Sequence, residues 1–109
     1  MAAVLFALLP GSGQAAAFLE AVEDIPLMPG LAEQTEAGLS FDTATGRIVE
    51  AYAHGDVSAT DVASFYTAAL PELGWQQITG LSFRREGEML RLDVTGQGPV
   101  TVRFTLSPQ

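Results

Sequence analysis

The last third of the chain alternates apolar and polar residues with the two-residue period of a β-strand. Every second residue from 100 to 106 is apolar, with threonine or arginine between: Val100, Val102, Phe104 and Leu106. Residues 89–94 repeat this pattern, and residues 75–85 read as another strand that Gly80 interrupts with a bulge or bend. Because short turns join these segments, the region predicts an antiparallel meander of three strands.

Residues 57–73 carry the spacing of one apolar stripe along an α-helix. The stripe consists of Val62, Phe65, Tyr66, Ala69, Leu70 and Leu73. Ser58 stands at the N-cap position with Asp61 three residues later, and Pro71 and Gly74 favour an end to the helix. We expect Phe65 and Tyr66 to anchor this helix on a sheet, and Trp75 to close the end of the core.

Residues 39–42 and 47–53 alternate in the same way, and the turn-like residues 43–46 join them into a predicted hairpin. Val49, Ala51 and Ala53 share one face of the second strand, and Ile48, Glu50 and Tyr52 share the other. The element order is therefore ββ-α-βββ. It predicts an α+β fold over residues 38–109, in which one amphipathic helix packs on an antiparallel sheet of four or five strands.

Residues 18–37 form a predicted N-terminal arm, because Pro26 and Pro29 prevent a continuous helix. One interpretation lays this arm over the hydrophobic face of the domain. The other leaves part of it exposed as a docking patch for a protein partner. The residues that would make this patch are apolar: Ile25, Leu27, Met28 and Leu31.

Residues 1–17 carry no charge and combine an apolar run, a Pro-Gly break and an alanine-rich exit. These are features of a secretory signal peptide, although no basic residue precedes the apolar run. A short helix packed on the domain and an uncleaved anchor are the alternatives. The run is far shorter than the roughly 20 residues that a membrane-spanning helix needs, so we expect no integral membrane protein.

The composition excludes several function classes. The formal net charge is −8, from thirteen acidic residues against five arginines, and this sign opposes binding to nucleic acid. Cysteine is absent, which removes disulfides, thiolate metal sites and thiol nucleophiles. Hydrophobic residues make up 48% of the chain, enough to build a core.

The candidates for chemistry are few. His54 is the single histidine, and only Asp56 lies near it in a loop, without a third residue at the spacing of a metal site or a catalytic triad. Arg84 and Arg85 precede Glu86 and Glu88 at a hairpin tip, where cross-strand ion pairs or an acidic ligand would explain them. We therefore expect no catalytic residues, no metal and no cofactor.

The helix and its exit resemble a known pattern. Val62-x-x-Phe65-Tyr66-x-x-x-Leu70-Pro71-x-Leu73-Gly74-Trp75 is similar to the V-x-x-FY-x-x-x-LP-x-x-GW helix of small exported bacterial envelope domains. In those domains the helix leads into an antiparallel meander. The resemblance covers residues 56–106, implies the fold and an envelope setting, and carries no catalytic residues.

Two functions follow as expectations. The first is a non-catalytic domain, periplasmic or secreted, that binds another envelope protein through the open sheet face, an edge strand or the arm. The alternative is a small-ligand or lipid binder with a pocket between helix and sheet. Neither the partner nor the oligomeric state can be derived from the sequence.

Overall fold

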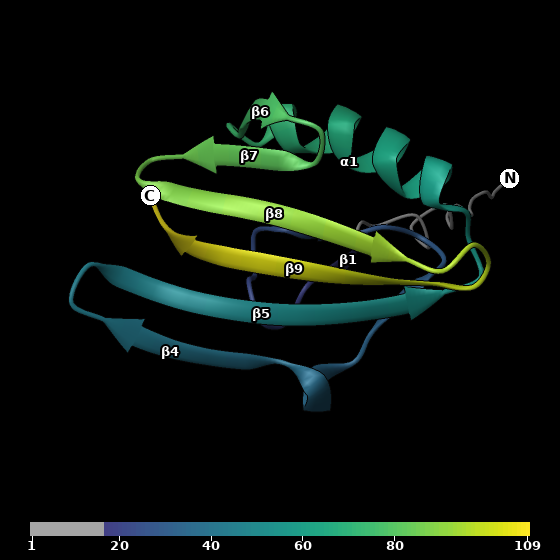
Figure 1. Ribbon diagram of the computed structural model, residues 1–109, viewed down its shortest axis with the longest axis horizontal. Coiled ribbons are helices and arrows are strands. Elements are labelled where there is room, and N and C mark those ends of the chain that lie inside the picture. Colours follow the sequence, from purple (N-terminus) through teal and green to yellow (C-terminus); the bar gives the residue numbers. More distant parts are fainter. Residues whose placement is uncertain (1–16) are drawn as a thin grey trace, which may run out of the picture.

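The computed structural model describes residues 17–109, which form an α+β fold with one α-helix and an antiparallel sheet (Figure 1). The N-terminal elements are β1 (Ala17–Phe18), β2 (Pro26–Leu27), β3 (Leu31–Glu33) and the 3₁₀ turn η3 (Thr35–Ala37). The hairpin strands β4 (Leu39–Thr43) and β5 (Gly46–Gly55) precede the helix α1 (Ala59–Glu72). Four strands follow it: β6 (Gln76–Thr79), β7 (Ser82–Arg85), β8 (Glu88–Thr95) and β9 (Val100–Pro108). The leader predicted over residues 1–17 lies outside the described residues except for Ala17, and it stays a prediction.

The main sheet has seven strands, in the order β3-β5-β9-β8-β7-β6, with β4 also paired to β5. The expected count of four or five strands was therefore too low. One of the additional strands comes from the arm, because β3 pairs with the end of β5 from Leu31↔Gly55 to Glu33↔Ala53. Gly55 permits this close approach, since a Cβ atom there would lie 2.0 Å from the carbonyl oxygen of Gly30.

The other additional strand arises where the sequence suggested a bulge. Gly80 has a φ of +52°, and the chain turns back there instead of continuing. The side-chain amide of Gln77 donates to the carbonyl oxygen of Gly80 at 2.7 Å, which holds the turn. Residues 76–85 therefore form the β6–β7 hairpin, and the order after the helix is four strands rather than three.

The predicted faces of the long strands are confirmed. In β5, Val49, Ala51 and Ala53 are buried, while the residues between them are half-buried. Buried residues also alternate along β8 and β9: Leu90, Leu92, Val100, Val102, Phe104 and Leu106. Together they make the covered face of the sheet, which is the face that packs against α1 and the arm.

The helix begins as the sequence predicts, because the hydroxyl of Ser58 accepts a hydrogen bond from the amide of Asp61 at 2.9 Å. It ends at Glu72, after Pro71, and Gly74 follows with a φ of +92°. Val62, Tyr66 and Leu70 are its buried residues, at a spacing of one helical turn. Phe65 is only half-buried and packs edge-to-face on Tyr66, with ring centroids 4.9 Å apart.

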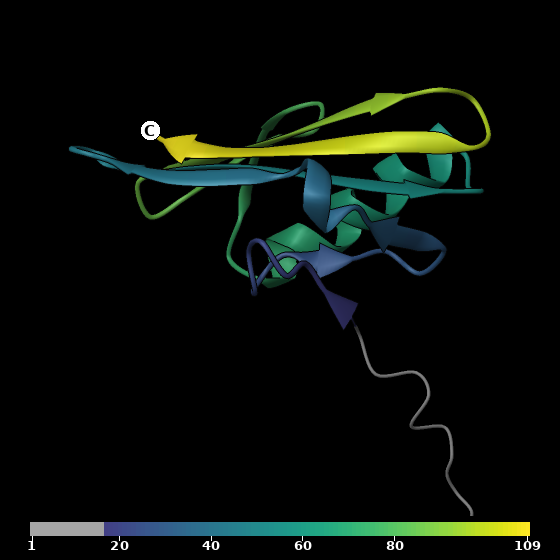
Figure 2. The ribbon, with the colours of Figure 1, turned by 90° about the horizontal axis from the view of Figure 1, so that it is seen from below.

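The arm lies on the same side of the sheet as α1 (Figure 2). It contributes four buried residues to the core: Leu19, Val22, Ile25 and Leu31. The carboxylate of Glu33 accepts hydrogen bonds from the amides of Glu20 and Ala21, at 2.6 and 3.3 Å, and so holds the turn of the arm. The arm and the domain after it therefore share one hydrophobic core.

Candidate protein-binding surface

The sheet face opposite α1 and the arm, called here the uncovered face, is polar over β8 and β9. The carboxylate of Asp93 accepts hydrogen bonds from Arg91 at 3.3 Å and from Arg103 at 3.2 Å. All three side chains are more than a third exposed, so water screens both ion pairs and they contribute little to folding. This part of the face needs no partner to be stable in water.

The uncovered face becomes apolar at β4. All five residues of this strand are exposed. Leu39 lies opposite Glu50 and Phe41 opposite Ile48, which places the two apolar side chains on the uncovered face. Leu39 is 48% exposed and Phe41 is 53% exposed. Two large apolar side chains on one short strand are therefore left in water.

The backbone of β4 is also open along one side. Among the described residues its only strand partner is β5. A two-residue loop joins Thr43 to Gly46, so these two residues form a hydrogen-bonded pair. From this pair towards Leu39, non-hydrogen-bonded and hydrogen-bonded pairs alternate. Counting back along the strand, the backbone N–H and C=O groups of Ser40 and Asp42 point away from β5. We call this outward side the β4 edge.

The β4 edge carries little net charge on an otherwise acidic chain. Asp42 is the one ionisable residue of the strand, and it lies directly opposite Arg47 of β5. Arg47 in turn donates two hydrogen bonds to the carboxylate of Glu88, at 3.0 and 3.3 Å. These bonds raise the pKa of the Arg47 guanidinium, which stays charged. Asp42 is thus the only charged side chain that the strand itself brings to the β4 edge.

The four residues predicted to bind a partner lie together, but largely inside the protein. Ile25 and Leu31 are buried in the core, and Leu27 and Met28 are half-buried against it. In this conformation the arm uses its apolar side chains to cover the domain. A surface made of these four residues would require the arm to leave the sheet.

Tyr66 fixes the arm to the helix. Its hydroxyl donates a hydrogen bond to the carbonyl oxygen of Pro26 at 2.8 Å and accepts one from the amide of Met28 at 3.1 Å. Burial raises the pKa of the Tyr66 phenol above its ordinary value. The ring packs edge-to-face on Phe104 at 5.6 Å, so Tyr66 links the arm, the helix and the sheet.

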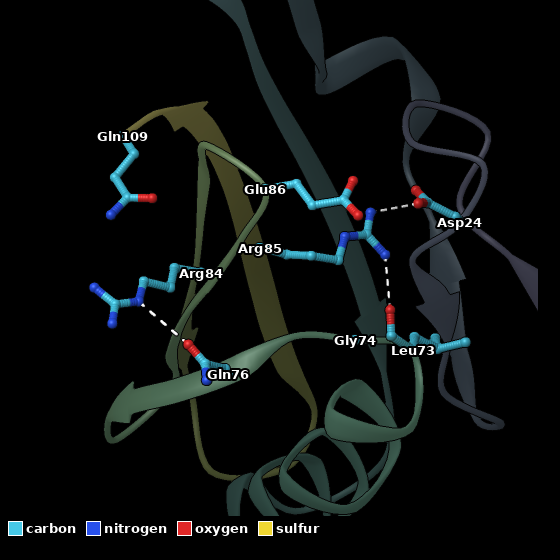
Figure 3. A pocket seen from close by; sticks show the side chains of 8 residues that line it. All are labelled: Asp24, Leu73, Gly74, Gln76, Arg84, Arg85, Glu86 and Gln109. Carbon is cyan, nitrogen blue, oxygen red and sulfur yellow. Dashed lines mark hydrogen bonds and ion pairs between the residues drawn. The ribbon is translucent and has the colours of Figure 1, made fainter.

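A polar hollow lies near the end of α1, where Arg84 and Arg85 point in different directions (Figure 3). Arg85 stacks on the ring of buried Trp75 at 4.3 Å, donates to the carbonyl oxygen of Leu73 at 2.9 Å and pairs with Asp24. The contacts of Arg85 are therefore internal. Arg84 is exposed and reaches the side chain of Gln76 at 3.5 Å, which is a weak contact.

The other candidates for chemistry lie apart. His54 is exposed at the end of β5, and Asp56 is exposed in the loop that follows. Within residues 17–109 no three potential ligand side chains come together as a metal site. The space between the helix and the sheet, where a ligand pocket was the alternative, is filled by large buried side chains: Tyr66, Trp75, Phe83 and Phe104.

The exposed apolar pair on β4 was not recognised in the sequence. Its signal is the alternation Leu39-Ser40-Phe41-Asp42, which looks the same in a strand whose apolar face is buried. The part of the chain that the structure describes contains no helix with the length and hydrophobicity to cross a membrane. Comparisons with protein-family models, with curated proteins and with solved structures find no match to this chain.

Proposed function

We propose that this chain is a non-catalytic protein-interaction module, and that it binds its partner by strand addition along the β4 edge. The observation that carries the proposal is the open strand itself: within residues 17–109 no strand pairs with its outward side, and Leu39 and Phe41 are exposed. In strand addition, main-chain hydrogen bonds supply affinity and alternate side chains supply specificity. Here the groups of Ser40 and Asp42 would bond the partner strand, and Phe41 would contact its side chains.

The proposed setting is the bacterial cell envelope, in a periplasmic or secreted form. The support for this setting is the uncharged apolar leader with its small-residue exit and the resemblance of residues 56–106 to exported domains. The partner in that setting is a protein of the cell envelope. Sequencing the N-terminus of the protein from a periplasmic extract tests the setting, and a mature start near Phe18 is the expected result.

Site-specific photo-crosslinking tests the binding edge. A photoreactive phenylalanine analogue at position 41 should form a covalent adduct with a protein in the native envelope. The same analogue at Thr67, which is exposed on α1, is the matched control and should not. An adduct from position 67 alone, or from neither position, would contradict strand addition at β4.

A second variant separates backbone pairing from apolar contact. Ser40→Pro removes an N–H that points away from β5, so the β4–β5 hairpin keeps its own hydrogen bonds. We expect the adduct from position 41 to disappear in this variant and to persist in the Ser40→Ala control. Persistence in both would show that no strand pairs with the edge.

A further inference from the structure

We infer that the strand added to β4 is β4 of a second copy of this chain, paired antiparallel about a two-fold axis at Phe41. This inference rests on the proposed function and names its partner. A two-fold interface is self-complementary, so the same strand must supply both sides. Phe41 is the middle residue of β4, and an axis there pairs all five residues of the strand with those of its copy.

The direction of the backbone groups fits this register. Phe41 lies opposite the partner's Phe41, and Ser40 lies opposite the partner's Asp42. The N–H and C=O groups of Ser40 and Asp42 point outward, so these two residues form hydrogen-bonded pairs across the axis. Phe41 then occupies a non-hydrogen-bonded pair, the position at which facing side chains come closest.

The side chains favour the same register. The two Phe41 rings meet on the uncovered face, each flanked by the Ile48 of its own copy. The hydroxyl of Ser40 can donate to the partner's Asp42 carboxylate. An axis at Asp42 would instead oppose two carboxylates. An axis at Ser40 would leave Thr43 outside the paired strand and would place Asp42 opposite the partner's Gly38.

Charge and area set the strength of this contact. Each copy carries a formal net charge of −8, so the two molecules repel, and Asp42 is the only charged residue that β4 itself brings to the contact. Salt screens the repulsion and should therefore strengthen the dimer. Five residues per copy bury less than the roughly 800 Å² per partner of a stable interface. We expect a dissociation constant on the order of micromolar rather than nanomolar.

Sedimentation of the full chain over a range of concentrations measures the dimer directly. We expect the dissociation constant to fall by at least about threefold between about 50 mM and about 500 mM sodium chloride. Ser40→Pro should raise the constant by at least about tenfold, while Ser40→Ala should leave it within about twofold. A monomer at all concentrations, or a dimer that Ser40→Pro leaves intact, would overturn the inference.

Cysteine crosslinking tests the register, and the natural chain contains no cysteine to interfere. Cα atoms in a non-hydrogen-bonded pair are about 4.5 Å apart, within the range that a disulfide spans. Phe41→Cys should oxidise to a covalent dimer at least about tenfold faster than Thr43→Cys or the exposed control Thr60→Cys. Equal rates at positions 41 and 60 would refute the axis at Phe41.

Strand addition at β4 and the second copy as its partner can be told apart by how each would fail. If the wild-type chain stays monomeric while position 41 crosslinks to a different envelope protein, strand addition stands and the second copy is excluded. If position 41 captures no protein and the chain is monomeric, both proposals fall.

Discussion

The central strands of the sheet and the edge strand β4 differ in whether their apolar residues are covered. The strands β8 and β9 lie under α1 and the arm, and their inward residues are almost fully buried. The tip of the β4–β5 hairpin reaches beyond α1 and the arm, as Figure 2 shows, and every residue of β4 is exposed, with Leu39 and Phe41 on the uncovered face. The same alternating pattern thus stabilises the fold in β8 and β9 and leaves apolar side chains exposed in β4. What distinguishes them is the face of the sheet: the apolar residues of β8 and β9 point towards α1 and the arm, and Leu39 and Phe41 point away from them.

The largest effect is expected at the point where helix, arm and sheet meet. Tyr66→Ala removes a fully buried ring together with both hydrogen bonds of its hydroxyl. Large aromatic-to-alanine substitutions in a core cost about 3–5 kcal/mol. Chemical denaturation measures this loss, and Phe65→Ala is the matched control because the neighbouring ring is only half-buried. Equal losses at the two positions would show that the packing of α1 and the arm on the sheet does not depend on Tyr66 in particular.

The hydroxyl of Tyr66 alone should contribute about 1–2 kcal/mol, since its loss leaves a buried carbonyl and a partly buried amide without partners. Tyr66→Phe measures this contribution at neutral pH. Burial raises the pKa of Tyr66 in the folded state, so its stabilising effect is complete below the unfolded pKa of about 10 and is lost as the pH rises above it. Wild-type stability should therefore fall above about pH 10, and the variant should lose less. Parallel curves for the two proteins would count against a buried neutral phenol.

The ion pair between the arm and the β7 end should matter less. Asp24 is about half exposed, so Asp24→Ala should cost no more than about 1 kcal/mol. Arg85→Ala should cost more than Asp24→Ala, because it also removes the stacking on Trp75 and the hydrogen bond to Leu73. Thermal melts of the two variants give the ranking. The reverse order would mean that the ion pair, and not the stacking, holds this end of the arm.

The smallest effect on stability is expected at the exposed end. Phe41→Ser changes a side chain that lies on the face opposite α1 and the arm and contacts mainly its cross-strand neighbour Ile48, so the free energy of unfolding should fall by no more than about 1 kcal/mol. Melts at low protein concentration, where a dimer does not form, provide the measurement. A loss comparable to that of Tyr66→Ala would show that Phe41 belongs to the core.

The elements with strong local signals could be predicted. The cap at Ser58, the turn at Gly74 and the inward faces of β5, β8 and β9 follow from residues a few positions apart. Strand β3 could not be predicted, because three residues between a proline-rich turn and a 3₁₀ turn show no period. Its formation depends on β5, whose paired residues lie 20 to 24 positions away in the sequence. Such distant pairing leaves no trace in local sequence.

The candidate surface escaped prediction for a related reason. Hydrophobic residues are expected to find cover, so the alternation in residues 39–42 suggests a buried face. Whether that face is the covered one depends on the register of β4 with β5, which places Leu39 opposite Glu50 and Phe41 opposite Ile48 on the uncovered face. The apolar residues of the arm looked equally suited to a partner, and Ile25 and Leu31 are buried in the core. The sequence pattern identified the apolar residues, but it did not show which of them are buried and which are exposed to water.

The position of β9 bears on how the protein is made. This strand comes last among those described, yet it lies in the middle of the sheet, between β5 and β8. A ribosome that has released only the first hundred residues has produced the strands on either side of β9, but not the strand that joins them into one sheet. Assembly must therefore wait for the final stretch to emerge, and a message truncated shortly before Val100 would yield a polypeptide with two open flanks rather than a slightly shortened domain.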